Sequence, residues 1–193
     1  MSMTAIKNFP KQVSLGRAGR RVILRPLEQS DAHELLNFFR RIPEEDRYFL
    51  KEDVTSPQVI ENWVEHIDYS RVLPLVAVAD GEIVADATLH RSRSRAHQHL
   101  GELRVVVDPR YRNHGLGTLL LEEMIYIAYD HEVDRLIMDL VDGREVSAIR
   151  VAEMLGFTQV ATLPGFARDM NGNDLDRVIL ELSMEHWRVR LTF

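Results

Sequence analysis

The chain has 193 residues, 45% hydrophobic and 28% charged, which allows one globular domain and excludes a disordered or fibrous chain. Its 24 Lys and Arg against 30 Asp and Glu give a net charge of −6, which argues against a general nucleic-acid-binding protein. The chain has no cysteine, so disulfides, thiolate nucleophiles and Cys-bound zinc are excluded. No apolar run approaches the ~20 residues of a membrane span, and Met1–Gln12 lacks the apolar core of a signal peptide. We therefore expect a cytoplasmic domain without a membrane partner.

The first part of the chain is predicted to hold a hairpin and two helices. Gln12–Pro26 contains two β-prone runs around glycines, a pattern typical of a hairpin. Ser30 is placed to cap a helix whose apolar residues recur at helical spacing, and the charged segment Ile42–Thr55 after it is predicted to be irregular. Ser56-Pro57 then opens a second helix, because proline at the first helical position loses no hydrogen bond.

Three strands are predicted in the middle of the chain. Leu73–Ala79 is a continuous apolar run, and Glu82–Leu89 returns from it after Asp80-Gly81, a pair typical of a tight hairpin turn. His90–Gln98 is interpreted as a polar loop, and Leu100–Asp108 as the third strand.

The last part of the chain alternates between helices and strands. Helices are predicted over Leu116–Asp130 and Arg144–Leu155, and strands over Arg135–Val141, Phe157–Leu163 and Asp176–Met184. Antiparallel strands followed by this alternation predict an α/β (α+β) fold, with a mixed, mostly antiparallel central sheet flanked by helices.

The loop between Asp108 and the helix at Leu116 carries the most specific pattern, Arg112-x-x-Gly115-x-Gly117. Its glycines let the backbone approach a ligand, and the free N–H groups of a helix start favour an anion such as a pyrophosphate. The Walker pattern and the full dinucleotide fingerprint are both absent. A simple turn before a buried helix is the alternative, but the strand, the proline, the arginine and the apolar helix together favour a phosphate site.

This loop resembles the acetyl-CoA pyrophosphate signature of the GNAT superfamily of N-acetyltransferases. VILRPLEQSDAHELLNFF is similar to the first strand and helix of that family, and Glu145–Phe157 to its last helix. The resemblance covers about Arg21–Met184. Within the superfamily, the chain looks closest to the GNAT domain of bacterial protein-lysine acetyltransferases, on the segments GRAGRRVILRPLEQSD and IPEEDRYFL and the ending Leu155-Gly156-Phe157.

The resemblance implies a GNAT fold with an N-terminal extension (1–20), an acetyltransferase domain (21–185) and a C-terminal tail (186–193). It also implies acetyl-CoA as co-substrate and no metal. The residues implied to bind acetyl-CoA are Val105, Val106, Val107, Arg112, Asn113, His114, Gly115, Leu116, Gly117 and Thr118.

Acetyl transfer to an amine needs a proton acceptor, because a lysine with a pKa of about 10.4 is mostly protonated at neutral pH. Glu102 stands ten residues before Arg112, where lysine acetyltransferases place a catalytic glutamate, so the resemblance implies that it is the base. An inert glutamate at a strand edge is the alternative. The backbone N–H of Val106 is implied to stabilise the charge on the thioester carbonyl oxygen.

Two positions depart from the family pattern. Ala152 stands where many relatives have a tyrosine that protonates the CoA thiolate, and Glu145 stands where an asparagine is frequent, which leaves the general acid unassigned. A protein lysine is the first choice of acceptor. A small amine (an amino acid, polyamine or antibiotic) and a non-catalytic acyl-CoA-binding sensor are the alternatives, and homodimer formation stays open.

Two further features favour ordinary structural roles, and a third is left open. His97-x-His99 has no third ligand at a clear spacing, so a polar loop is favoured over a metal site. Asp169–Asp174 has its glycine at the wrong position for a calcium loop and is predicted to be a hairpin turn. Tyr48 is either a substrate contact or an exposed loop residue.

Overall fold

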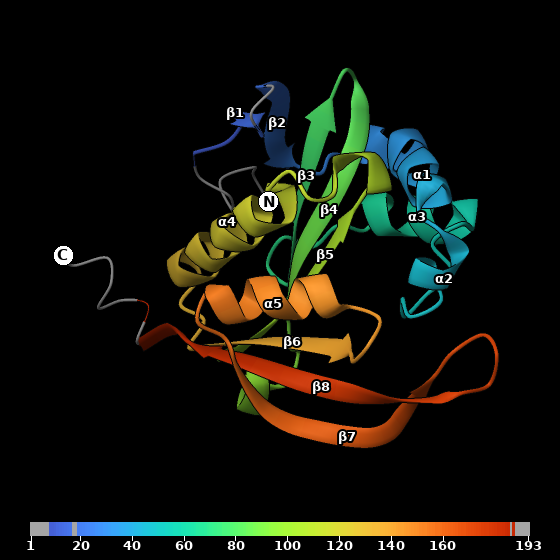
Figure 1. Ribbon diagram of the computed structural model, residues 1–193. Helices are drawn as coiled ribbons and strands as arrows, with labels where there is room; N and C mark the ends of the chain where they lie inside the picture. The colour runs from blue at the N-terminus through green and yellow to red at the C-terminus, as the bar shows by residue number, and fades with distance from the viewer. Residues whose placement is uncertain (1–7, 17–18, 186, 188–193) are drawn as a thin grey trace.

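The computed structural model describes residues 8–16, 19–185 and 187, which form an eight-stranded sheet with helices on both faces (Figure 1). The strands are β1 (Lys11–Leu15), β2 (Arg20–Pro26), β3 (Val72–Ala79), β4 (Glu82–Arg91), β5 (Leu100–Val107), β6 (Arg135–Val141), β7 (Thr158–Arg168) and β8 (Asp174–Ser183). The helices are η2 (Gln29–Asp31), α1 (Ala32–Arg41), α2 (Glu44–Arg47), α3 (Pro57–Glu65), η3 (Arg95–His97), η4 (Pro109–Tyr111), α4 (Leu116–Asp130) and α5 (Val146–Met154).

The strand order is β1-β2-β3-β4-β5-β6-β8-β7. Every neighbouring pair is antiparallel except β5 and β6, which are parallel. The predicted mixed, mostly antiparallel sheet is therefore confirmed. The turn between β3 and β4 has positive φ at both Asp80 (51°) and Gly81 (83°), as the Asp-Gly pair predicts for a two-residue hairpin.

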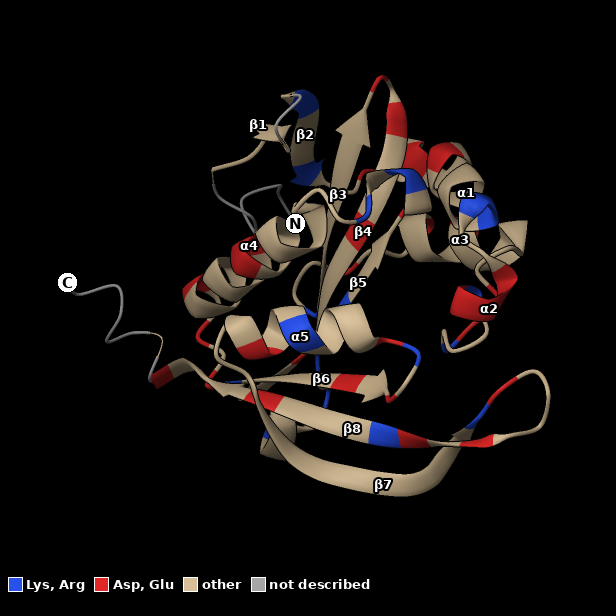
Figure 2. Cartoon of the chain, viewed as in Figure 1, with Lys and Arg blue, Asp and Glu red and all other residues tan. Residues whose placement is uncertain are grey.

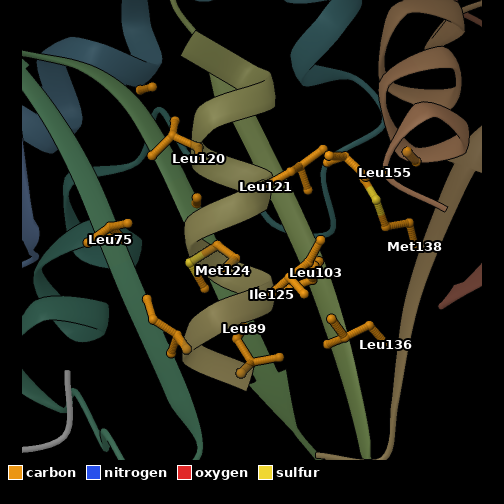
Figure 3. Packing of buried hydrophobic residues seen from close by; sticks show 14 of the residues in the cluster. Leu75, Leu89, Leu103, Leu120, Leu121, Met124, Ile125, Leu136, Met138 and Leu155 are labelled. Carbon is orange, nitrogen blue, oxygen red and sulfur yellow. The ribbon is translucent and has the colours of Figure 1, made fainter. Parts of the chain in front are cut away.

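The two faces of the sheet bury separate apolar clusters. On one face, α1 and α3 bury Phe38, Phe39 and Ile60 against strand residues that include Val76 and Ile83. On the other face lie α4 and α5, seen together at the front of Figure 1. Figure 3 shows Leu120, Leu121, Met124 and Ile125 of α4 against the sheet residues Leu75, Leu89, Leu103 and Leu136. The central strands are thus packed on both faces by helices, and β4 and β5 lie in the middle of the sheet.

The start of α1 differs from the prediction that Ser30 caps it. The helix begins after Asp31, and the preceding turn η2 is closed by a reciprocal pair between Glu28 and Asp31. Asp31 also accepts two hydrogen bonds from the Arg25 guanidinium, at 2.6 and 2.7 Å. A carboxylate that binds both a backbone N–H and an arginine fork replaces the weaker hydroxyl cap. The arginine comes from β2, outside the helix, so helical periodicity does not reveal this contact.

Two other segments differ from their predicted secondary structure. The segment predicted to be irregular contains the short acidic helix α2, coloured mostly red in Figure 2. Strand β7 continues past Leu163 to Arg168 because Pro164-Gly165 forms a bulge against β8, with φ of 68° at Gly165, instead of ending the strand.

The predicted domain boundary at residue 20 falls inside the β1–β2 hairpin, whose strands pair with each other in the same sheet. The predicted tail 186–193 lies outside the described residues, apart from Trp187. Within the described ranges, no helix is both long and apolar enough to cross a membrane.

Candidate active site

The parallel strands β5 and β6 pair over only three residues and then separate. The pairing runs from Leu100–Arg135 to Glu102–Ile137, and no pairs follow along either strand. The remainder of β5 therefore presents backbone groups to a gap on the β6 side. Such groups need partners when they are shielded from water, so this gap is suited to a ligand that carries amides.

The ladder between β4 and β5 decides which backbone groups face that gap. Asp108 donates its N–H to the Val84 carbonyl at 2.9 Å, and hydrogen-bonded pairs alternate along an antiparallel ladder. The Asp86–Val106 pair is therefore also hydrogen-bonded, and the N–H of Val106 points toward β4. The N–H groups of Val105 and Val107 point toward the gap. In this register the N–H of Val106, the donor expected from the sequence, lies on the β4 side of β5.

The loop after β5 has the backbone shape of an anion site. Asn113 and Gly115 have positive φ, at 59° and 85°, and Gly115 is the N-cap of α4. Leu119 donates its N–H to the Gly115 carbonyl, as the first bond of the helix ladder. The N–H groups before it, from Leu116 to Thr118, have no partner within the helix and carry its positive partial charge.

Both glycines of the loop leave room for a ligand. A Cβ added at Gly115 would meet no heavy atom within 4 Å, and one added at Gly117 would meet only Val107 Cγ2, at 3.7 Å. The Asp108 carboxylate fixes the start of the loop, since it accepts bonds from the guanidinium and the backbone N–H of Arg110 and from the Arg41 guanidinium. Burial raises the Asp108 pKa, but these donors outweigh it and lower the pKa to about 2.

Arg112 and His114 support the loop from within. Arg112 donates its Nε–H to the Val107 carbonyl at 3.0 Å, and its Nη2 lies 2.8 Å from the Asp46 carboxylate on α2. His114 Nδ1 lies 2.5 Å from the Arg112 carbonyl. In this structure the Arg112 guanidinium thus holds the end of β5 against the acidic α2.

A cavity of about 810 Å³ opens beside β5 and brings several of the predicted residues together. Its walls include Glu102, Val105 and Val106, whereas Arg112 to Thr118 lie outside it. Aromatic side chains contribute to the lining, namely Phe39, Tyr48, Phe49, Trp63 and Phe166. Tyr48, which the sequence left open, is therefore both a cavity residue and about half exposed.

Glu102 carries two ion pairs inside this cavity. Its Oε1 lies 2.8 Å from Lys51 Nζ and 2.9 Å from Arg104 Nε. Partial burial raises the pKa of Glu102, but the two cations outweigh it and lower the pKa to about 2. Glu102 is therefore an ionised, strongly paired carboxylate at neutral pH.

Three further titratable residues line the cavity: Asp86 was missed by sequence reasoning, His90 was assigned to a polar loop, and Glu145 was noted only as a departure from the family pattern. Burial raises the pKa of Asp86 to about 7, and burial together with Arg104 lowers the pKa of His90 to about 4, so His90 is neutral at pH 7. Burial also raises the pKa of Glu145, although its carboxylate accepts the Val141 N–H at 2.6 Å. For Asp86 the signal was present: it is the only charged residue in the run IVADATL.

The other residues singled out from the sequence have structural roles in the fold. Ala152 is fully buried in the core, so a hydrophobic contact occupies the position of the family's tyrosine. Asp169 accepts the N–H groups of Asn171 and Asn173 in the turn between β7 and β8, which confirms the predicted hairpin. No group of three or more His, Asp or Glu that could hold a metal occurs among the described residues.

Comparisons with known proteins agree with this geometry. The L-amino acid N-acetyltransferase AaaT of Escherichia coli (strain K12) is 31% identical over 98 residues, which are 49% of this chain and 59% of that relative. The match thus spans about three fifths of the length of AaaT. The GNAT domain of S. lividans PAT has a TM-score of 0.74 at 22% identity, covering 90% of this chain and 96% of that one.

The protein yncA from Salmonella typhimurium, whose structure was determined with its cofactor acetyl-CoA, has a TM-score of 0.71 at 20% identity. The alignment covers 84% of this chain and 94% of yncA. The model of the acetyltransferase (GNAT) family matches residues 32–157, about two thirds of the chain. The chain therefore belongs to the GNAT family of acetyltransferases.

Proposed function

We propose that this acetyltransferase moves the acetyl group of acetyl-CoA to a primary amine by direct attack while both substrates are bound. The observation that carries the proposal is the separation of β5 from β6 next to the start of α4. It joins unpaired strand amides, a glycine loop and a cavity lined with carboxylates at one place. Pantetheine carries amides, the pyrophosphate is an anion and the acceptor is a cation, so each part meets a complementary group.

Acetyl-CoA would bind along the gap and across the loop. The backbone of Val105 and Val107 supports pairing with the pantetheine amides. The free N–H groups from Leu116 to Thr118, together with the turn at Asn113 to Gly115, would hold the pyrophosphate. When bound, the thioester supplies an activated acyl group with CoA thiolate as the leaving group.

The N–H of Val105 takes the stabilising role that the sequence assigned to Val106. Val105 lies three residues beyond Glu102, the last residue of β5 that pairs with β6, and its N–H faces the gap where the thioester would lie. A backbone donor at this position would bind the carbonyl oxygen as it gains charge, without reorganisation of the protein.

The acceptor amine would enter from the cavity. A lysine side chain of a protein is the first candidate, since it is a slender apolar arm that fits between aromatic walls such as Tyr48, Trp63 and Phe166. A free amino acid is the second, because AaaT acts on L-amino acids. Arg71 supports it: this residue lines the cavity, and its buried Nε has no hydrogen-bond partner among the described residues, so a carboxylate can meet it.

Two measurements test this proposal. Acetyl-CoA should raise the thermal midpoint of the wild-type protein. Gly117→Val should abolish this shift in the midpoint, because the methyl groups of the valine would occupy the path of the pyrophosphate. Gly172→Asn, in the β7–β8 turn with a positive φ of 84°, is a matched control that should keep it. Equal shifts in all three proteins would contradict the assignment. Mass spectrometry of a protein mixture and of free amino acids, each incubated with enzyme and acetyl-CoA, would then show which acceptor is acetylated.

A further inference from the structure

Asp86 is a carboxyl group in the middle of the central strand β4, and it has no partner among the residues that the structure describes. Its neighbours along the strand are Ala85 and Ala87, and the residues opposite it are Val76 on β3 and Val106 on β5. It lines the cavity. The side chain is half-buried, and no hydrogen bond or ion pair joins it to any of the described residues.

Nothing in the fold explains a carboxyl group at this position. The flanking side chains Val76 and Val106 belong to the apolar cluster under α1 and α3, where a valine or threonine would pack without penalty. An unpaired carboxylate against such a wall is destabilising, and unpaired titratable groups of this kind concentrate at functional sites. Asp86 is half-buried and lines the cavity in which the acceptor would bind.

Several charged groups on the elements packed beside β4 are paired with one another. On β5, Glu102 and Arg104 are paired, and Lys51 joins them from the loop after α2. At the end of α1, Arg41 bonds Asp108 and the Ile83 carbonyl. Other titratable groups of the cavity lining are Glu52, His66, Asp68, Arg71, His90, Asp139, Glu145, Arg168 and Arg177, while α4 covers the opposite face of β4.

Glu102 and Asp86 are therefore suited to different tasks. Two cations lower the pKa of Glu102 to about 2, so its carboxylate is ionised at neutral pH and is a weak proton acceptor. Burial alone raises the pKa of Asp86 to about 7, close to the value at which a carboxylate both exists and accepts a proton at neutral pH. Two carboxylates whose surroundings separate them in this way commonly divide acid–base and electrostatic roles.

We propose, on the basis of the proposed function, that Asp86 is the catalytic base and that Glu102 is a positioning residue. Asp86 lies directly across the ladder from Val106, beside the stretch of β5 that would hold the thioester. Glu102 fixes Lys51 and Arg104, which keeps both cations away from the acceptor ammonium.

The proposed step conserves protons and electrons. The Asp86 carboxylate takes one proton from the acceptor ammonium, and the freed nitrogen lone pair forms a C–N bond to the acetyl carbon. The C–S bond then breaks and the thiolate of CoA leaves with its electron pair. A second proton on the new amide nitrogen passes to that thiolate, which is released as the thiol, and Asp86 returns its proton to water.

The pH dependence of kcat/KM in wild type, Asp86→Asn and Glu102→Gln tests this assignment, with one acceptor so that its own titration cancels. We expect wild type to show a limb with an apparent pKa near 7. Asp86→Asn should lose this limb and about 10²-fold or more in rate, while acetyl-CoA affinity measured by calorimetry stays unchanged. Asp86→Glu should restore part of the rate. Glu102→Gln should keep the limb and raise KM more than it lowers kcat.

The proposal is overturned if Asp86→Asn keeps the limb at a rate within a few-fold of wild type, or if Glu102→Gln removes it. A wild-type protein that binds acetyl-CoA but transfers to no amine would overturn the proposed function, and this proposal with it. Infrared or NMR titration of the carboxyl group provides an independent measurement. A difference between wild type and Asp86→Asn near pH 7 supports the assignment, and a difference only near pH 4 contradicts it.

Discussion

Asp86→Asn should make the protein more stable at neutral and alkaline pH while it removes activity. The substitution keeps the size of the side chain and eliminates its ionisation. In the unfolded chain Asp86 ionises above its ordinary pKa of 3.8, whereas in the folded protein burial raises the pKa to about 7. The wild-type protein therefore loses stability as pH rises through this window, because the folded state holds a proton that the unfolded state has released.

The size of the effect follows from the two pKa values. Each pH unit between 3.8 and about 7 corresponds to about 1.4 kcal/mol, so the full difference is about 4 kcal/mol above pH 7. This figure is an upper bound, since the carboxyl group faces a cavity that water can enter. Below pH 4 both proteins carry a neutral group and should be about equally stable.

Urea or guanidinium unfolding of both proteins at several pH values between 4 and 8 measures this difference. We expect the gap in unfolding free energy to grow steadily with pH in favour of Asp86→Asn, and the thermal midpoint to rise by about 2–4 °C per kcal/mol. A variant that is equally stable or less stable at pH 8, with no pH trend, would refute the placement of an unpaired carboxylate against an apolar wall.

Three further predictions concern stability. Gly101→Ala should destabilise the fold by about 1–3 kcal/mol, since its Cβ would lie 2.5 Å from Leu89 Cδ1; an unchanged urea midpoint would argue against it. Asp108→Asn should cost about 3 kcal/mol at pH 7, because it removes the carboxylate that Arg110 and Arg41 share; in wild type this stability should fall as pH drops from about 4 toward 2, which acid unfolding measures. Glu102→Gln should cost only about 1 kcal/mol at pH 7, since its partner Lys51 is exposed, and this loss should vanish near pH 2.

Local sequence signals predicted most of the fold. The strand β6 and the helix α4 have the bounds that apolar periodicity indicated, because each is decided by residues within one element. The Asp-Gly turn was also predictable, since its positive φ values are a local preference. The start of α1 was not, because the guanidinium of Arg25, brought in by β2, decides where Asp31 accepts its bonds.

The candidate site follows the same division. The glycine loop could be predicted from the sequence, because a ligand that approaches the backbone requires glycine at fixed spacing. The ion pairs of Glu102 could not be predicted, because its partner Lys51 lies about fifty residues away in the sequence. The direction of the Val106 N–H depends on the register against β4, which a single strand does not specify. Asp86 showed only as a charge in an apolar run, and its meaning required the residues on β3 and β5 that leave it unpaired.

Steady-state release of CoA thiol from acetyl-CoA tests the central claim most directly. The assay would combine wild type or Gly117→Val with lysine-bearing proteins, with free amino acids and with no acceptor. The proposed function predicts release that saturates with an amine acceptor, exceeds the uncatalysed background and disappears in Gly117→Val. Binding of acetyl-CoA without thiol release for any amine would contradict acetyl transfer and identify the chain as an acyl-CoA-binding sensor.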